Sequence, residues 1–165
     1  MLIICYDGSE DARAAITHAG ALLGGQPATV LSVWEPFTEV VTRSSLGIVP
    51  LIPSEIDMEK IDAASEQRAR ELAQEGAALA NEAGFRAEPR TRRQDTTVAA
   101  AILAEAAAVD ASAVVMGSRG LTGLKSALVG SVSHAVIQHA DRTVIVVPSP
   151  PVAAERRRRA QELDG

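Results

Sequence analysis

Aromatic residues and cysteine are scarce in this sequence. Its 165 residues include one Trp, one Tyr, two Phe and one Cys, although 47% of them are hydrophobic. The core must therefore consist of aliphatic side chains, and the chain lacks the aromatic platforms on which single-stranded nucleic acids stack. Cys5 has no second cysteine for an internal disulfide, and no pair of thiols has metal-ligand spacing. This usage fits a reducing, cytoplasmic location.

Long apolar runs and a strong positive charge are also missing. The apolar start, LIIC, leads directly into YDGSE, which is too short for a signal peptide or a membrane span, so we expect a soluble protein. A net charge of -5 argues against DNA binding. Basic residues do gather in FRAEPRTRR and in residues 156–159. We interpret the second group as part of a solvated, frayed helical tail, with binding to a partner as the alternative.

Apolar runs and helical periodicities alternate along the chain. Short apolar runs that end at turn residues predict strands, and apolar residues at helical spacing predict helices. Ser9 is predicted to cap the first helix, and Asp95 or Thr96 to cap an alanine-rich helix that ends near Val109. We predict strands at 2–6, 28–34, 85–91, 113–116 and 143–147. Besides the alanine-rich helix, we predict helices at 10–23, 56–83 and 131–139.

This alternation predicts an α/β fold with one five-stranded, parallel, doubly wound sheet in the order 3-2-1-4-5 and helices on both faces. We assign residues 1–148 to a single nucleotide-binding domain and residues 149–165 to a Pro- and Arg-rich tail. Ligands of such sheets bind at the carboxyl ends of the strands, where the strand order reverses. Asp7 and Gly117 follow the first and fourth strands, so we expect the ligand between them.

The segment from Met116 to Ser133, here called the glycine segment, contains the main chemical signal. It includes glycines separated by two and by nine residues, namely Gly117, Gly120 and Gly130. Glycine lets backbone approach a ligand closely. Ser131 is predicted to cap a helix whose free amides, at Val132 and Ser133, favour anions. The pattern lacks the lysine of a P-loop and the spacing of a dinucleotide fingerprint, yet it predicts a phosphate site.

This spacing, preceded by a strand ending in Met-Gly, resembles the ATP-binding signature of the universal stress protein family. The start IICYDGSEDARAAI and the strand TVLSVWEP also fit the family pattern, so the resemblance covers roughly residues 1–148. It implies that Asp7 lies near the adenosine and that Val33 helps to form the adenine pocket. It also implies that ribose and phosphates are held by Met116, Gly117, Gly120, Gly130, Ser131, Val132 and Ser133.

Several residues keep two interpretations. Arg119 either reaches a phosphate or points into water, and Asp7 is either a ligand contact or only an Asx-turn residue. Cys5 is interpreted as a small packed residue rather than a redox group. The histidines have no helpers nearby in sequence and are assigned neither to catalysis nor to a metal site: His18, His134 and His139.

The resemblance implies a regulator in stress adaptation that binds ATP and is recognised by a protein partner. Residues 35–55 lack periodicity and are the candidate moving element. The strand Thr143–Val147 is expected at a sheet edge, where it would form a homodimer. One alternative is a slow ATPase or nucleotidyl-transfer enzyme in which Asp7 helps to hold Mg²⁺; another is a nucleotide-free dimeric interaction module. Because no catalytic base accompanies the glycines, we expect binding rather than rapid turnover.

Overall fold

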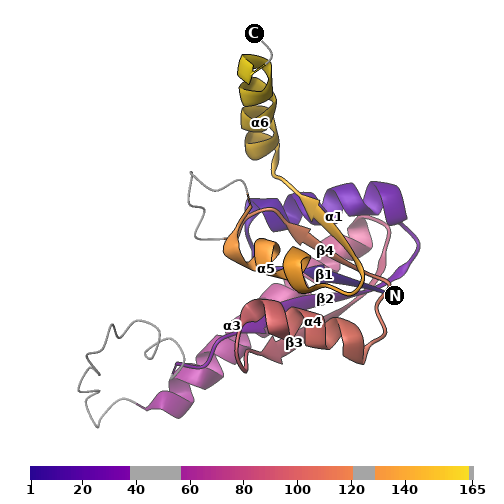
Figure 1. Cartoon of the computed structure of the whole chain (residues 1–165). Coiled ribbons are helices and arrows are strands. Elements are labelled where there is room, and N and C mark those ends of the chain that lie inside the picture. The colour runs from indigo at the N-terminus through magenta and orange to yellow at the C-terminus, as the bar shows by residue number, and fades with distance from the viewer. Residues whose placement is uncertain (38–56, 121–128, 164–165) are drawn as a thin grey trace, which may run out of the picture.

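Five parallel strands form one sheet in the order β3-β2-β1-β4-β5 (Figure 1). The structure, a computed structural model, describes residues 1–37, 57–120 and 129–163. The predicted fold class and strand order are confirmed, and β5 lies at an edge of the sheet as predicted. The strands are β1 (Leu2–Cys5), β2 (Pro27–Trp34), β3 (Arg86–Arg93), β4 (Ala113–Gly117) and β5 (Thr143–Val147).

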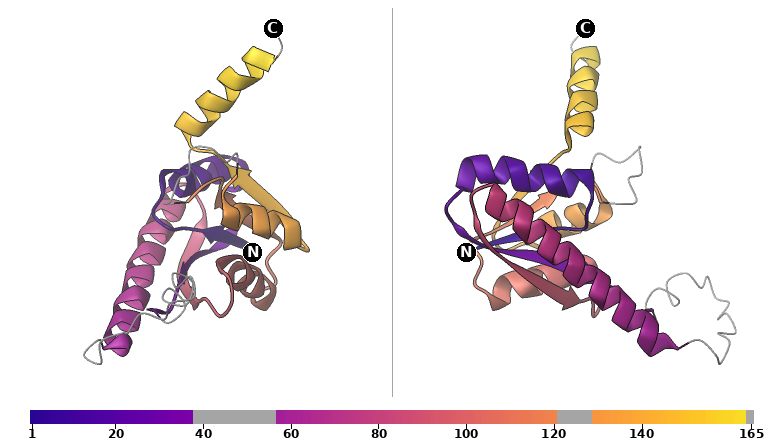
Figure 2. Two further views of the ribbon diagram at one scale, coloured as in Figure 1. Left: turned by 60° about the vertical axis from the view of Figure 1, so that its left-hand side comes forward. Right: turned by 180° about the vertical axis from the view of Figure 1, so that it is seen from behind.

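Helices cover both faces of this sheet. One apolar cluster joins one face of the sheet to α1 and α3, and a second joins the opposite face to α4 and α5. A further helix, α6, extends away from the body of the molecule (Figure 2), where a frayed helical tail was predicted. The helices are α1 (Glu10–Leu23), α3 (Met58–Glu82), α4 (Val98–Ala108), α5 (Ser131–His139) and α6 (Pro150–Leu163).

The central strand β1 shows why continuous apolar runs form this sheet. Successive side chains of a strand point to opposite faces. Ile4 therefore packs in the cluster with α1 and α3, while Ile3 packs in the cluster with α4 and α5. Both side chains have no solvent exposure. A strand covered on both faces needs apolar residues at every position, which is the pattern in β1 and β4.

Helix α3 packs on the sheet through its smallest residues. Its buried positions are Ala69, Ala73, Gly76, Ala77 and Ala80. A Cβ on Gly76 would lie 2.7 Å from Cγ of Tyr6 and 2.8 Å from Cγ1 of Val30. The helix axis can approach the sheet this closely only because Gly76 has no side chain.

Helix caps agree with the predictions in part. The Ser9 hydroxyl accepts a hydrogen bond from the Ala12 amide, so Ser9 caps α1 as predicted. Thr97, rather than Asp95 or Thr96, caps α4. The predicted cap was wrong because the buried side chain of Gln94 donates to the Thr96 carbonyl, which keeps this residue in the preceding turn.

Two sequence-based expectations lie partly outside the described residues. Of the predicted moving element, residues 35–55, only residues 35–37 are described, and the middle of the glycine segment, residues 121–128, is not. Within the described ranges, no helix is long and apolar enough to cross a bilayer.

Candidate functional site

A cavity of about 440 Å³ opens at the carboxyl ends of β1 and β4. These adjacent strands flank the point at which the strand order reverses, the usual ligand position in a doubly wound sheet. All ten residues proposed from the sequence line it: Asp7, Val33, Met116, Gly117, Arg119, Gly120, Gly130, Ser131, Val132 and Ser133. The chain therefore brings together positions from three strands and one helix.

The carboxylate of Asp7 lies between its own turn and the glycine segment. One oxygen, Oδ1, accepts a hydrogen bond of 3.0 Å from the Ser9 amide, which is the Asx turn considered from the sequence. Gly8 within this turn has φ of +82°, which an L side chain rarely adopts. A Cβ on Gly120 would lie 2.7 Å from the other oxygen, Oδ2. Glycine at position 120 thus lets the Asp7 carboxylate approach the glycine segment.

The other two glycines of the signature, Gly117 and Gly130, differ in what surrounds them. A Cβ on Gly117 would lie 2.7 Å from the carbonyl carbon of Asp11 and 2.9 Å from the Ala12 amide nitrogen. Gly117 is therefore required for close packing of α1 against β4. At Gly130 the same atom would lie 3.4 Å from its nearest neighbours, Arg119 and Ser118, which is ordinary contact. Space at position 130 stays open on the cavity side.

Asp11 supports this site from outside the cavity lining, a role that the sequence interpretation missed. Its carboxylate is buried, with 6% exposure. Oδ2 accepts hydrogen bonds from the Ser118 hydroxyl at 2.7 Å and from the Arg119 amide at 3.0 Å. In the sequence Asp11 had only the meaning of an acidic residue in the first turn of a helix. Its actual contact fixes the start of the glycine segment on α1.

The N-terminus of α5 faces the cavity without a side-chain cap. Gly130, with φ of -67° and ψ of 159°, occupies the cap position, and no side chain forms a cap hydrogen bond there. The prediction that Ser131 is the cap was wrong. The Gly130 amide donates to the Ser118 carbonyl at 2.7 Å and holds residue 130 extended, so the helix begins at Ser131. The first-turn amides of such a helix have no intrahelical acceptor and attract anions.

Apolar residues form another part of the cavity lining. They come from the ends of β1, β2 and β4 and from α4: Cys5, Leu31, Val33, Val98, Ile102 and Met116. Burial first, and then the charge of the nearby Asp7 carboxylate, raise the pKa of the Cys5 thiol from 9.0 to about 12. The cavity lining thus has an apolar part and a part made of glycines, the first residues of α5 and Arg119.

A larger hollow of about 580 Å³ lies between β2 and the first half of α3. It shares Val33 and Glu35 with the cavity at β1 and β4, but its lining includes neither the glycines nor the helix N-terminus. Its lining is mainly apolar. We therefore place the candidate site in the smaller cavity, where the backbone donors are.

The fold and the site define a doubly wound α/β protein with a glycine-bordered cavity at its topological switch point. The profile of the Universal stress protein family matches residues 1–148, and the chain belongs to this family. The chain is 30% identical over 146 residues to universal stress protein YxiE of Bacillus subtilis (strain 168). This match covers 88% of this chain and 97% of that protein.

Solved structures share the fold. Hypothetical protein MJ0577 matches with a TM-score of 0.70 and 21% identity, over 89% of this chain and 94% of that one. The universal stress protein of Archaeoglobus fulgidus in complex with dAMP matches with a TM-score of 0.58 and 20% identity, over 88% and 95% of the two chains. Others with this fold are a universal stress protein in complex with cAMP and an Arabidopsis thaliana family protein with AMP bound.

Proposed function

We propose that the protein binds an adenine nucleotide, ATP in particular, in the cavity at the ends of β1 and β4, and acts as a nucleotide-responsive regulator in stress adaptation. The convergence on one cavity of all ten residues predicted from the sequence carries this proposal. The volume of about 440 Å³ is within the usual range for small-molecule sites. Family members of the same fold in complex with dAMP, cAMP and AMP support an adenine nucleotide.

Each part of a nucleotide has a chemical match in the lining. The phosphates fit the N-terminus of α5, whose amides at Ser131, Val132 and Ser133 provide donors and a positive helix dipole. The adenine fits the apolar side at Val33 and Met116. The adenosine hydroxyls fit the Asp7 carboxylate, a hydrogen-bond acceptor.

Magnesium would accompany ATP through the phosphates, with Asp7 as an indirect contact. Mg²⁺ in nucleotide sites keeps several waters and takes few protein carboxylates. The described residues contain no group of three or more His, Cys, Asp or Glu side chains suited to a metal ion. We propose that the site holds ATP rather than cleaving it rapidly, with a slow ATPase as the enzymatic alternative.

The regulatory output would come through association. We propose that the protein forms a homodimer through the edge strand β5, whose outer backbone groups are available for pairing. We further propose that it is cytoplasmic and that another protein recognises it. Residues 1–148 would form the nucleotide-binding domain and residues 149–165 the tail outside it. Residues 35–55 are proposed as the element that responds to the nucleotide. DNA binding is not expected at a net charge of -5.

Two substitutions at one position test the phosphate assignment. Asp and Asn are both favourable helix caps, and a Cβ at position 130 meets only ordinary contacts. Gly130→Asp puts a negative charge beside the phosphates, so we expect it to weaken ATP binding about tenfold or more relative to Gly130→Asn. Isothermal titration calorimetry with ATP, ADP, AMP and cAMP measures the affinities.

The same titrations can refute the proposal. Equal affinities of Gly130→Asp and Gly130→Asn for ATP would contradict the placement of the phosphates at the N-terminus of α5. A wild-type protein that binds none of the four nucleotides would favour the nucleotide-free interaction module. Release of inorganic phosphate at about 1 per second or faster would make the protein an enzyme.

A further inference from the structure

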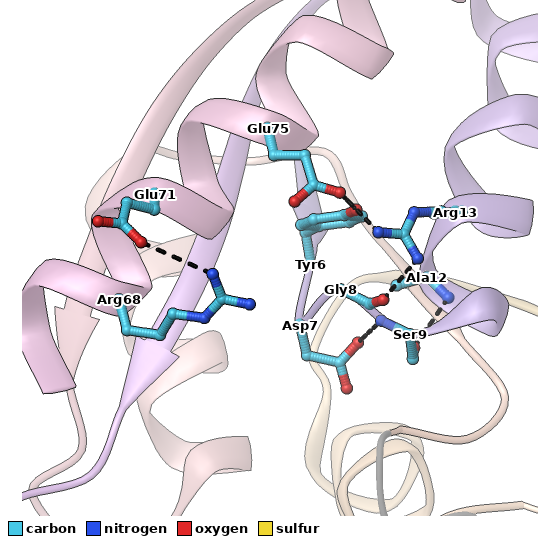
Figure 3. Close-up of polar contacts among 9 residues, drawn as sticks. All are labelled: Tyr6, Asp7, Gly8, Ser9, Ala12, Arg13, Arg68, Glu71 and Glu75. Carbon is cyan, nitrogen blue, oxygen red and sulfur yellow. Dashed lines mark hydrogen bonds and ion pairs between the residues drawn. The ribbon is translucent and has the colours of Figure 1, made fainter.

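Both neighbours of Asp7 are tied to one carboxylate on α3 (Figure 3). The Tyr6 hydroxyl donates to Oε1 of Glu75 at 2.5 Å. The Arg13 guanidinium donates to the same oxygen at 2.6 Å, and its other nitrogen donates to the Gly8 carbonyl at 2.8 Å. Glu75 therefore reaches the residue before Asp7 directly and the residue after it through Arg13.

Packing holds the three side chains in this arrangement. The Tyr6 ring is 2% exposed and lies against Gly76, the residue after Glu75. The guanidinium of Arg13 lies 5.9 Å from the centroid of that ring, within the range of a cation–π contact. A glycine inside a helix costs about 1 kcal/mol relative to alanine. Here it allows α3 to come close enough for Glu75 to reach these partners.

Position 8 adds a second contact between α3 and this turn. A Cβ on Gly8 would lie 3.0 Å from Cδ2 of Leu72, so the turn backbone runs directly along α3. Asp7, between Tyr6 and Gly8, directs Oδ1 to the Ser9 amide and Oδ2 toward Gly120. The direction of the Asp7 carboxylate therefore depends on backbone that α3 supports on both sides.

We propose that Glu75 is a positioning residue for the nucleotide site, which fixes the Asp7 carboxylate in the cavity through Tyr6 and Arg13. This inference rests on the proposed nucleotide binding for its ligand, but the ordering of residues 7–9 by Glu75 does not. Glu75 itself is absent from the residues lining the cavity. Its effect on affinity would thus be transmitted through the protein.

A matched pair of variants separates positioning from a general charge effect. Glu75→Gln keeps the size of the side chain and removes its charge. Glu71→Gln makes the same change four residues earlier on α3, where the carboxylate pairs with Arg68 at 3.6 Å and not with the Asp7 turn. The side chains of Glu75 and Arg13 are 43% and 51% exposed, so the electrostatic contribution is modest. We expect Glu75→Gln to weaken ATP binding roughly three- to tenfold and Glu71→Gln less than about twofold.

A measurement without nucleotide tests the positioning alone. The Ser9 amide is bonded to Asp7, so its hydrogen exchange, followed by NMR, reports on the order of the turn. We expect exchange at Ser9 to accelerate roughly three- to tenfold in Glu75→Gln and to stay at the wild-type rate in Glu71→Gln.

The outcomes are distinguishable. If wild type binds no nucleotide but Ser9 exchange responds to Glu75→Gln alone, the proposed function fails and the positioning of the turn stands. If wild type binds ATP and the two variants bind it equally well, Glu75 has no positioning role. Equal Ser9 exchange in both variants would also overturn the proposal. In a double-mutant cycle, the losses of ATP-binding free energy in Arg13→Gln and Glu75→Gln should be non-additive. Additive losses would contradict the coupling between these two side chains.

Discussion

The buried carboxylate of Asp11 accepts a 2.7 Å hydrogen bond from the hydroxyl of Ser118, 107 residues further along the chain. The same carboxylate oxygen accepts the Arg119 amide. Helix α1 is thereby joined to the first turn after β4. This contact fixes the beginning of the glycine segment on α1.

Removing the Asp11 carboxylate should destabilise the fold. In Asp11→Ala the Ser118 hydroxyl, with 0% exposure, and the Arg119 amide lose their acceptor. We expect the free energy of unfolding to fall by about 1–3 kcal/mol, measured by urea denaturation. Asp11→Asn retains an acceptor oxygen and should lose less. If Asp11→Ala unfolds at the wild-type urea concentration, the contact does not stabilise the protein.

Alanine at two of the glycines, Gly117 and Gly130, should affect stability to different degrees. Gly117→Ala places a Cβ 2.7 Å from backbone of Asp11, and neither β4 nor α1 can move away cheaply. We expect a loss of about 1–3 kcal/mol from overpacking. Gly130→Ala meets only contacts of 3.4 Å and should stay within about 1 kcal/mol of wild type. Thermal denaturation of both variants measures this, and equal melting temperatures would contradict the packing role of Gly117.

Cys5 should be unreactive in the folded protein. Burial, reinforced by the Asp7 carboxylate, raises the pKa of its thiol to about 12, so the nucleophilic thiolate is rare at mildly alkaline pH. We expect iodoacetamide to label Cys5 slowly in the native protein and readily in urea, as followed by mass spectrometry. Rapid, complete labelling of the native protein would show that this pKa is not raised.

Tyr6, the only tyrosine, should ionise at unusually high pH. Burial first, and then the hydrogen bond and charge of Glu75, raise its pKa from 10.0 to about 12. A raised pKa means that the unfolded chain loses this proton first, so the contribution to stability is complete below pH 10 and disappears as pH approaches about 12. Ultraviolet titration of the phenol measures the pKa. Glu75→Gln should lower it, and an unchanged value would exclude Glu75 as a cause.

The strand order and most element boundaries could be predicted from local patterns. Apolar runs such as those of β1 and β5 are bounded by turn residues, and the alternation with helices leaves few sheet orders. The boundaries of β3 were less accurate, because this exposed edge strand has little apolar character. It extends to Arg93 because it pairs with β2 as far as Trp34, and a partner strand is not visible in a local pattern.

Ten of the residues that line the cavity were predicted from the sequence, but the contacts that hold them in place were not. The glycine spacing and Asp7 are local signals at strand ends. The contacts that orient them join residues 107 positions apart, as in Asp11 and Ser118, or 69 apart, as in Tyr6 and Glu75. Gly117 was predicted as a ligand contact and has a packing role besides, since the space that it leaves is taken by α1. Nothing in the sequence distinguishes a glycine that admits a ligand from one that admits a helix.

Helix α1 has a consequence for how the cavity could change its width. Through Ser9 and Arg13 it stabilises the turn on one wall, and through Asp11 it holds the glycine segment on the other. Both walls are therefore attached to the same helix. A displacement of α1 would move them together and leave the distance between them almost constant. Any widening has to arise in the parts that α1 does not hold, such as α5.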